Sequence, residues 1–485
     1  MTNIPTIDIA DGLTISRMVT GLWQIADMER NNRLLDRDLL VKCMQDYFQQ
    51  EYTTFDMADH YGSAEIIAGQ FRRGLINEYQ KPQLLTKWVP TLEDREKEDV
   101  RDAIHLSMKR LGVEQIDLLQ YHAWNYADPI WLDHLFWLME LQHEGLIAHL
   151  GLTNFDMPHL KLAVDSGIPI QSNQISFSLL DQRARRQMCD YCKVSGIKIL
   201  AFGTLAGGFL SNKWMGRPEP SSGDLVTWSQ MKYKRYIDAL GGWDHFQDLL
   251  GILHSISQRH QVSIAQVAAK FVLDQQGVGA IIVGARLGES EHIDENKSVF
   301  EVILEEEDVN RLVEWHDQGN LPGNCGDEYR KPPYLTAKGD LSDHISGFPA
   351  PYPQTQNAFQ RSICHTGTSW EELAGFSRAI KVGNRVLVSG TTSTHGSKVI
   401  GGKDPASQTH FIIDKIEGAL QTLGAGLKDV VRTRIYVKDP NQWMPIAQAH
   451  GARFREVSPA NTLIHADLIG SEYLVEIEAE ALLVE

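Results

Sequence analysis

The chain has 485 residues, of which 42% are hydrophobic and 22% charged, a composition typical of a globular protein large enough for two or three domains. Acidic residues outnumber basic ones by 63 to 46, and the formal charge of −17 argues against nucleic acid or an anionic membrane as a partner. Five cysteines are too few for a disulfide scaffold, and no run of about 18 apolar residues marks a membrane span. The amino-terminal stretch also lacks the basic and apolar regions of a signal peptide, so we expect a cytoplasmic protein.

Short stretches rich in β-branched and aromatic residues alternate with longer stretches of helical periodicity over residues 1–318. The short stretches read, in chain order, RMVTGLWQ, TTFDMA, QLLTKWV, IDLLQYH, AHLGLTN, IQSNQIS, IKILAFG and VGAIIVG. Helical periodicity between them is clearest in DVRDAIHLSMKRLGV and WLDHLFWLMELQHEGLI. Strand and helix repeated eight times predict an α/β fold, the (β/α)8 TIM barrel. The preceding DIADGLTI predicts a hairpin with an Asp-Gly turn, which would close the bottom of the barrel.

Residues 319–357 are rich in proline, glycine and polar residues, which predicts either a linker or a lid over the barrel mouth. From residue 358 the pattern changes again. SRAIKVGNRVLVSGTT predicts two strands, QTHFIIDKIEGALQTLGAG a helix, DVVRTRIYVKD a strand, WMPIAQAHGARFREV a second helix, and TLIHADL and YLVEIEAEALL two further strands. We therefore expect a smaller α+β domain over residues 358–485, with helices on a mixed sheet.

Four polar side chains follow successive predicted barrel strands: Asp56, Tyr61, Lys87 and His122. The carboxyl ends of barrel strands share one face, where catalytic groups gather. Hydride addition to a carbonyl carbon creates an alkoxide, which Tyr61 can protonate, and the ammonium of Lys87 would make that phenol a stronger acid. Asp56 would balance the buried ammonium, and a neutral His122 would orient the carbonyl oxygen. The four residues therefore predict carbonyl reduction.

The motifs FDMADHYGSAE, LLTKWV, LLQYHAW and GLTNF occur in this order and together resemble the aldo-keto reductase family, over roughly residues 10–318. The resemblance implies that Asp56, Tyr61, Lys87 and His122 form a catalytic tetrad, and that a nicotinamide cofactor lies across the barrel mouth. The contacts that it implies for the cofactor are Thr153, Asn154, Gln174, Phe202, Leu205, Gly207, Arg286 and Asn296. Three tryptophans are expected to line the pocket of a small, rather apolar aldehyde or ketone: Trp23, Trp88 and Trp124.

The preferred cofactor depends on the adenosine end of the predicted site. Arg286 matches the basic residue with which the family contacts the 2′-phosphate of NADP, whereas His292 stands where many members have a second arginine. One arginine still gives a charge-assisted contact, so the resemblance favours NADP(H) over NAD(H).

The cysteines and the histidines are the other residues that could carry chemistry. Cys189 and Cys192 have the CxxC spacing of a redox motif, but they lie in an expected barrel helix without a thioredoxin-like context, so we expect buried thiols. The histidines are scattered, and we expect no metal site.

The stretches GFSRAIKVGNRVLVSGTT, DVVRTRIYVKD and LVEIEAEA resemble the RidA-like family of reactive imine deaminases, which has a chorismate-mutase-like fold. The resemblance implies a trimer with ligand sites between subunits, and Glu476 matches the carboxylate that acts on the attacking water. Asn461 stands where active deaminases have an arginine for the substrate carboxylate, and Phe376 stands where they have a tyrosine. These departures leave both imine hydrolysis and simple ligand binding open.

The sequence thus predicts an NADP-dependent carbonyl reductase fused to a RidA-like domain. Two alternatives remain open. The barrel could be a non-catalytic, nucleotide-sensing interaction protein, since some members of the family serve as regulatory subunits. It could also be a sugar or alcohol dehydrogenase that works in the oxidative direction.

Overall fold

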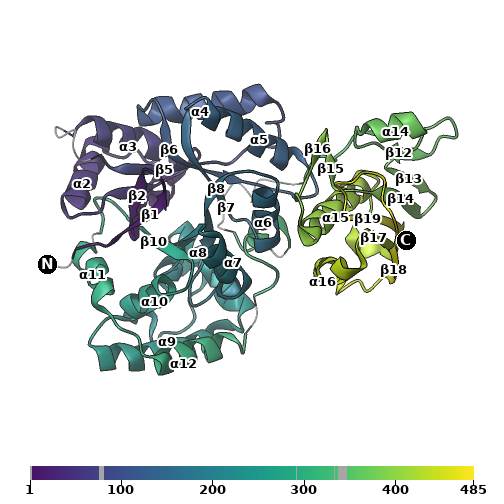
Figure 1. Cartoon of the computed structure of the whole chain (residues 1–485). Coiled ribbons are helices and arrows are strands. Elements are labelled where there is room, and N and C mark those ends of the chain that lie inside the picture. The colour runs from purple at the N-terminus through teal and green to yellow at the C-terminus, as the bar shows by residue number, and fades with distance from the viewer. Residues whose placement is uncertain are drawn as a thin grey trace. The chain divides into compact units, whose positions relative to one another are not determined.

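The computed structural model describes residues 3–75, 81–290, 292–319, 321–332, 334–336 and 347–484 (Figure 1). By their internal contacts the residues form two compact units. The first comprises Met1–Trp124, Trp137–Met157 and Ile170–Ser346, and the second comprises Asn125–Phe136, Pro158–Pro169 and Gly347–Glu485. Each unit is described by itself.

A closed barrel of eight parallel strands dominates the described part of the first unit. In barrel order the strands are β10 (Val278–Gly284), β3 (Met18–Gly21), β4 (Thr54–Asp56), β5 (Gln83–Trp88), β6 (Ile116–His122), β7 (Ile147–Thr153), β8 (Ile170–Ser176) and β9 (Lys198–Phe202). Each strand overlaps one of the eight stretches that the sequence predicted. The prediction of a TIM barrel is therefore confirmed.

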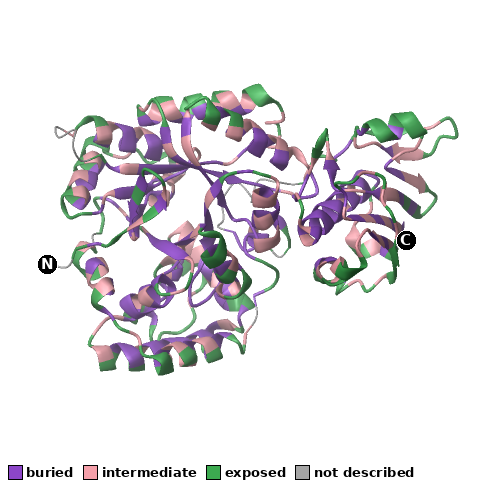
Figure 2. Ribbon diagram, viewed as in Figure 1, coloured by how far each residue is buried: buried purple, intermediate pink, exposed green. Residues whose placement is uncertain are grey.

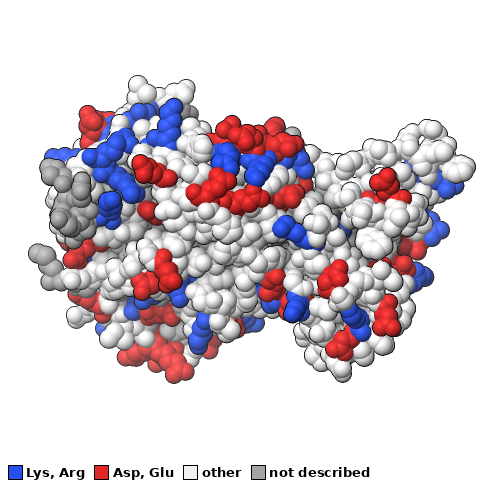
Figure 3. All heavy atoms as spheres, turned by 45° about the horizontal axis from the view of Figure 1, so that its top comes forward, with Lys and Arg blue, Asp and Glu red and all other residues white. Residues whose placement is uncertain are grey.

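Helices follow the strands along the chain, and those of the first unit surround the barrel. They are α1 (Trp23–Met28), α2 (Arg37–Gln49), α3 (Ala64–Arg73), α4 (Lys97–Leu111), α5 (Ile130–His143), α6 (Met157–Asp165), α7 (Gln187–Ser195), α8 (Trp228–Ala239), α9 (Gly242–His260), α10 (Ile264–Leu273), α11 (Ile293–Lys297) and α12 (Glu306–His316). Figure 2 shows the buried residues on the strands and on the inner sides of these helices. Figure 3 shows acidic and basic side chains interspersed over α4 and α5, where Lys97 pairs with Glu140 and Arg101 with Glu144.

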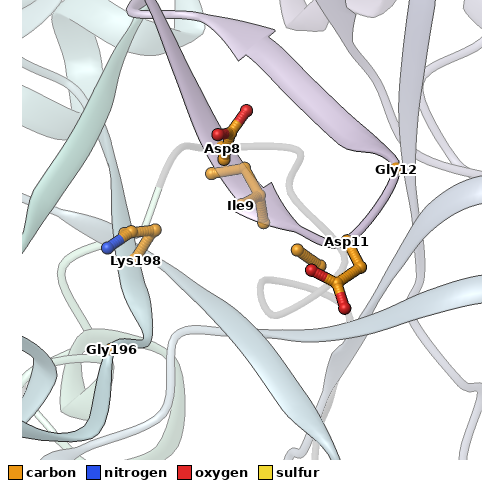
Figure 4. Close-up of a pocket in the computed structure, with 7 residues that line it drawn as sticks. Asp8, Ile9, Asp11, Gly12, Gly196 and Lys198 are labelled. Carbon is orange, nitrogen blue, oxygen red and sulfur yellow. The ribbon is translucent and has the colours of Figure 1, made fainter.

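The predicted hairpin precedes the barrel. Strands β1 (Thr6–Ala10) and β2 (Leu13–Ser16) pair antiparallel around a turn in which Gly12 has φ +80°, a conformation that favours glycine. Ile9, Leu13 and Ile15 join the core inside the barrel, together with Leu118. A pocket of about 330 Å³ lies beside the hairpin and reaches Lys198, the first residue of β9 (Figure 4). This pocket is at the amino-terminal end of the strands, away from the end where barrels carry catalytic groups.

The second unit contains a mixed sheet, described in the order β11-β12-β13-β14-β19-β17-β18. Its strands are β11 (Gln354–Gln356), β12 (Ser362–Cys364), β13 (Ala379–Val382), β14 (Arg385–Thr391), β17 (Val430–Val437), β18 (Ala460–His465) and β19 (Val475–Leu482), with the small pair β15 (Thr394–His395) and β16 (Lys398–Val399) apart. The helices are α14 (Ser369–Ala374), α15 (Pro405–Thr422) and α16 (Trp443–Phe454). Apolar residues of α15 such as Ile416 form one core with Val388 and Ile477 of the sheet. The predicted α+β domain is confirmed.

Part of the segment that was predicted as linker or lid folds with the barrel. It forms the short helix α13 (Asp327–Arg330). The buried guanidinium of Arg183 lies 2.7 Å from Asp181 and 2.8 Å from Glu328 of this helix, and both carboxylates are fully buried. Residues 337–346 of the segment lie outside the described residues.

Candidate active site

The tetrad residues meet at the carboxyl end of adjacent barrel strands. Asp56 ends β4, Lys87 lies near the end of β5, His122 ends β6, and all three are at most 3% exposed. Lys87 Nζ donates to Asp56 Oδ2 at 2.6 Å and to the carbonyl of Met57 at 2.8 Å. The same ammonium lies 5.0 Å from the centroid of the Tyr61 ring, which is only partly buried. The structure therefore brings all four residues together.

The carboxylate of Asp56 is fixed through both of its oxygens. Burial lowers the pKa of Lys87, and the charge and hydrogen bond of Asp56 oppose that effect. The other oxygen, Oδ1, accepts from Gln174 Nε2 at 2.7 Å and from Gln120 Nε2 at 3.1 Å. Gln120 was not among the sequence candidates. It precedes His122 by two residues on one strand, so the alternation of side chains would have placed it on the same inner face.

His122 is a neutral imidazole. Burial, reinforced by the nearby charge of Arg330, lowers the pKa of His122 to about 3. Its Nδ1 lies 3.4 Å from the carbonyl oxygen of Thr153 and 3.5 Å from Asn154 Nδ2. Its Nε2 is buried and has no hydrogen-bond partner among the described residues. The imidazole can therefore offer Nε2 to a bound molecule.

Two of the three predicted tryptophans lie beside these residues. The ring of Trp23 is 4.9 Å from that of Tyr61, and the ring of Trp124 is 4.4 Å from that of His122. Trp88 follows Lys87 on β5, and successive residues of a strand point to opposite sides. It packs 5.6 Å from Tyr121, on the outer side of the barrel, and the structure does not bring it to the mouth.

The residues expected at the nicotinamide carboxamide lie next to the tetrad. Thr153 Oγ1 donates to the carbonyl of Gln174 at 3.2 Å, and the backbone N–H of Asn154 donates to the same carbonyl at 2.8 Å. Asn154 has φ +60°, and its buried Oδ1 has no hydrogen-bond partner among the described residues. A buried amide oxygen without a donor fits a ligand that carries an N–H group, as the carboxamide does.

The loop after β9 provides the other expected contacts. Phe202 ends the strand, and Leu205 and Gly207 follow in a tight turn. Gly207 has φ +62°, and a Cβ at this position would lie 2.9 Å from the backbone of Ser229. Only glycine fits this turn, because the backbone of α8 packs directly against it.

Arg286, expected at the adenosine end, is held by two carboxylates. Its Nη1 donates to Asp27 Oδ2 at 2.7 Å, and its Nε donates to Glu289 Oε2 at 2.8 Å. Neither carboxylate was among the sequence candidates. Asn296 lies nearby along the chain on α11, and His292 is exposed.

Helix α13 adds two residues to the barrel mouth. The ring centroid of Tyr329 is 5.6 Å from that of His122, and its hydroxyl accepts from Lys232 Nζ at 2.7 Å. Arg330 donates to the carbonyl of Ala123 at 3.3 Å, directly after His122. The composition of residues 319–357 indicated a linker or lid and gave no signal for these contacts.

The second unit separates the predicted ligand residues. Phe376 lies 5.4 Å from the guanidinium of Arg378. Burial raises the pKa of Glu476, and the charge of the same arginine opposes this shift. Asn461 instead donates to Thr433 Oγ1 at 2.9 Å, on the face of the sheet that α16 covers. Glu476 on β19 pairs with Tyr436 of β17. Tyr436 lies three residues after Thr433, and side chains alternate along a strand, so Glu476 is on the opposite face of the sheet. One chain therefore does not bring Asn461 and Glu476 together.

The remaining predictions concern thiols, metals and membranes. All five cysteines lie in described positions and are buried, and burial raises the pKa of Cys189 and of Cys192 to about 12. Where the structure describes the chain, no group of three or more His, Cys, Asp or Glu side chains is arranged to hold a metal ion. No described helix is both long enough and apolar enough to cross a membrane.

A parallel barrel with a buried lysine–aspartate pair, a tyrosine and a neutral histidine at the strand ends defines a TIM-barrel oxidoreductase. The chain belongs to the aldo/keto reductase family, whose profile matches residues 17–317, and it is an NAD(P)H-dependent oxidoreductase. The profile described as Endoribonuclease L-PSP matches residues 366–483, which confirms the RidA-like domain.

Individual relatives agree with both assignments. The chain is 24% identical over 327 residues to the NADH-specific methylglyoxal reductase of Escherichia coli, an alignment that covers 62% of this chain and 95% of that protein. Its second domain is 29% identical over 123 residues to a RutC family protein of Pyrococcus abyssi, covering 25% of this chain and 96% of the relative. The solved glycerol dehydrogenase AKR11B4 from Gluconobacter oxydans shares the fold, with a TM-score of 0.53, 22% identity, and coverage of 67% and 98%.

Proposed function

We propose that the barrel reduces an aldehyde or a ketone to an alcohol, with Tyr61 as the general acid and with NADP(H) favoured over NAD(H). The observation that carries the proposal is the buried pair of Lys87 and Asp56, with its ammonium 5.0 Å from the Tyr61 ring and beside the neutral His122. We also propose that the chain has three parts: the barrel over residues 1–318, a linker or lid over residues 319–357, and the RidA-like domain over residues 358–485.

The bound nicotinamide supplies the hydride. The hydroxyl of Tyr61 donates a proton to the carbonyl oxygen as charge develops there, and the adjacent ammonium of Lys87 stabilises the phenolate that remains. Asp56 keeps that ammonium charged in a buried site.

His122 orients the carbonyl oxygen by donating from Nε2. This role requires the tautomer that carries its proton on Nε2, in which Nδ1 accepts. The amide of Asn154, 3.5 Å away, can donate to Nδ1 in this tautomer, whereas the carbonyl of Thr153, 3.4 Å away, accepts from Nδ1 in the other one.

The residues that would hold the cofactor fit its chemical groups. Asn154 Oδ1 would accept from the carboxamide, and Phe202 would stack on the nicotinamide ring. The remaining contacts in this proposal are Thr153, Gln174, Leu205, Gly207, Arg286 and Asn296. The preference for NADP rests on Arg286. Its guanidinium would bind the 2′-phosphate of NADP while it keeps its contacts to Asp27 and Glu289.

A small carbonyl compound is the proposed substrate, because Trp23 and Trp124 flank the tetrad. The name of the E. coli relative suggests methylglyoxal as the first substrate to test.

The test is the oxidation of NADPH and of NADH at 340 nm with methylglyoxal and a panel of other aldehydes and ketones. We expect Tyr61→Phe to lower kcat by at least about 100-fold while nucleotide binding survives, because a positioned general acid contributes 10²–10⁴-fold. Tyr191→Phe, on α7 outside the site, is the matched control and should keep wild-type activity.

Two outcomes would favour the alternative functions. Tight nucleotide binding without turnover of any carbonyl would favour a nucleotide-sensing protein. Faster oxidation of sugars or alcohols, with little carbonyl reduction, would favour a dehydrogenase.

For the RidA-like domain we propose trimer formation and either imine hydrolysis or binding of a small ligand. The sheet face opposite the helices exposes Leu387, Ile464 and Leu482 at 40%, 39% and 38%. Such apolar side chains on one sheet face fit a surface that a second copy covers. The separation of Asn461 from Glu476 within one chain also fits a ligand site built between copies.

The mass in solution tests the trimer, which should weigh about three times the 54.6 kDa of one chain. If the domain hydrolyses imines, Glu476→Gln should slow the disappearance of an imine derived from an amino acid. The released carbonyl would then be available to the barrel, so that the two domains would act in sequence. An imine that disappears no faster with the protein than without it would leave ligand binding as the function of this domain. The buried free thiols of Cys189, Cys192, Cys325 and Cys364 support the proposed cytoplasmic location.

A further inference from the structure

Tyr61 is the one residue of the tetrad that does not lie on a barrel strand. Asp56, Lys87 and His122 belong to β4, β5 and β6, whose backbones are fixed by the hydrogen bonds of the barrel. Tyr61 instead lies in the loop between the end of β4 and the start of α3 at Ala64. Side chains on loops are held less precisely than side chains on strands, so the phenol of Tyr61 needs other contacts to keep its position.

The carboxylate of Glu29 holds this loop directly after the tyrosine. Glu29 follows the last residue of α1, and its Oε2 accepts from the backbone N–H of Ser63 at 2.9 Å. Its other oxygen, Oε1, accepts from the hydroxyl of Ser63 at 2.5 Å. Ser63 is 6% exposed, and both hydrogen bonds are charge-assisted, which is the stronger kind in proteins. The loop is therefore tied to α1 two residues beyond Tyr61.

Two residues of the loop are adapted to this carboxylate. Gly62 has φ +55°, and a Cβ at this position would lie 2.0 Å from Glu29 Oε2, so the carboxylate would have to move away if residue 62 carried a side chain. Ser63 is the N-cap of α3, where a serine side chain normally accepts from a backbone N–H of the first helical turn. Its hydroxyl makes no such bond and donates to Glu29 instead. The usual cap of α3 is thus replaced by a bond to α1.

Helix α1 also contacts the ring of Tyr61. Trp23 is the first residue of this helix, and its ring lies 4.9 Å from that of Tyr61 at an angle of 70°. One end of α1 therefore contacts the phenol ring, and the other end holds the backbone that follows it. The ammonium of Lys87 is 5.0 Å from the same ring. A shift of the loop would change this separation, on which the acidity of the phenol depends.

We propose that Glu29 is a positioning residue for the general acid, and that it fixes the phenol of Tyr61 through Ser63. This inference rests on the proposed reductase function. Glu29 touches neither substrate nor cofactor in this account and acts on the reaction through Tyr61 alone. A displacement of about 1 Å at a reacting group can cost about 100-fold in rate, so the loss of Glu29 should lower kcat and leave KM nearly unchanged.

The kinetic test compares Glu29→Ala in two backgrounds, with the best carbonyl substrate of the panel. In the wild-type chain we expect kcat to fall by at least about 10-fold, and KM for the carbonyl and for NADPH to change by less than about threefold. In the Tyr61→Phe background we expect no further loss of the residual rate, because the residue through which Glu29 acts is already disabled. Glu29→Gln keeps an oxygen acceptor and should restore part of the rate. The matched control is Glu98→Ala, at an exposed position of α4, which should keep wild-type activity. Equal losses in both backgrounds, or an unchanged kcat in the wild-type chain, would overturn the proposal.

A spectroscopic test separates this inference from the reductase function. In protein labelled with fluorotyrosine, the fluorine NMR signal of Tyr61 is the one that Tyr61→Phe removes. Glu29→Ala should shift or broaden this signal, Ser63→Ala should do so to a smaller extent because it removes only the hydroxyl, and Glu98→Ala should leave the signal unchanged. If Glu29→Ala does not fold, Ser63→Ala decides, with a loss of kcat of about threefold that is absent in the Tyr61→Phe background.

The two functions then fail separately. A displaced Tyr61 signal in the variants, without turnover of any carbonyl by the wild type, would support the positioning of Tyr61 by Glu29 and refute the reductase. Carbonyl turnover by the wild type, with an unchanged Tyr61 signal in both Glu29→Ala and Ser63→Ala, would keep the reductase and refute the positioning role.

Discussion

The buried, neutral His122 should make the barrel sensitive to acid. Its ordinary pKa is 6.5, and burial lowers it to about 3 in the folded state. Between these values the unfolded chain binds a proton that the folded chain refuses, so the free energy of unfolding falls as the pH drops below about 6.5. Each pH unit of this interval costs about 1.36 kcal/mol, and the loss from this one group is therefore about 2 kcal/mol at pH 5.

The assay is urea unfolding at pH 7 and at pH 5, followed by tryptophan fluorescence. His122→Gln removes the titrating group, so its loss of stability between the two pH values should be about 2 kcal/mol smaller than that of the wild type. His105→Gln is the control, because His105 is exposed on α4, and it should behave as the wild type does. If the wild type and His122→Gln lose the same stability, the imidazole is not held neutral by burial and its proposed role fails.

Three further substitutions test separate parts of the site. Gln120→Leu removes one donor to Asp56 Oδ1 and should lower kcat by at least about 10-fold with little change in KM, because a lost hydrogen bond to a charged group costs about 1.5–3 kcal/mol. An unchanged kcat would mean that the hydrogen bond from Gln174 is sufficient. Glu289→Gln removes a carboxylate that competes with the 2′-phosphate for Arg286, so NADPH should bind about threefold tighter while the affinity for NADH is unchanged. An equal change in affinity for both nucleotides would contradict this account. Ile464→Arg should convert the proposed trimer into single chains, and an unchanged mass would place the interface elsewhere.

The sequence was sufficient for the barrel and for the position of the tetrad because both depend on local patterns. β-Branched and aromatic residues mark each strand in the sequence. A polar residue at the carboxyl end of a strand lies at the mouth of the barrel. Trp88 and Gln120 follow the same local rule. Strict alternation from Lys87 puts Trp88 outside, and alternation from His122 puts Gln120 inside.

Other features depend on contacts between residues far apart in the chain. Arg183 meets Glu328 across 145 positions, and Lys232 meets Tyr329 across 97. The sequence of residues 319–357 has no periodicity that would indicate such partners. Its composition does not distinguish an unattached linker from a segment that packs on the barrel. The carboxylates that hold Arg286 were missed for the same reason, since Asp27 lies 259 residues away.

The place of α13 in the barrel mouth determines where this protein can be divided. The reductase profile ends at residue 317, and a reductase gene trimmed there would look complete. Such a fragment would lose Glu328, Tyr329 and Arg330, leaving the ion pair of Arg183 and Asp181 without its third member and His122 without its cover. A division that keeps these contacts has to lie beyond Arg330, so this part of the segment between the two domains belongs structurally to the barrel. A chimaera in which either domain is replaced by that of a homologue would therefore have to keep this segment with its own barrel.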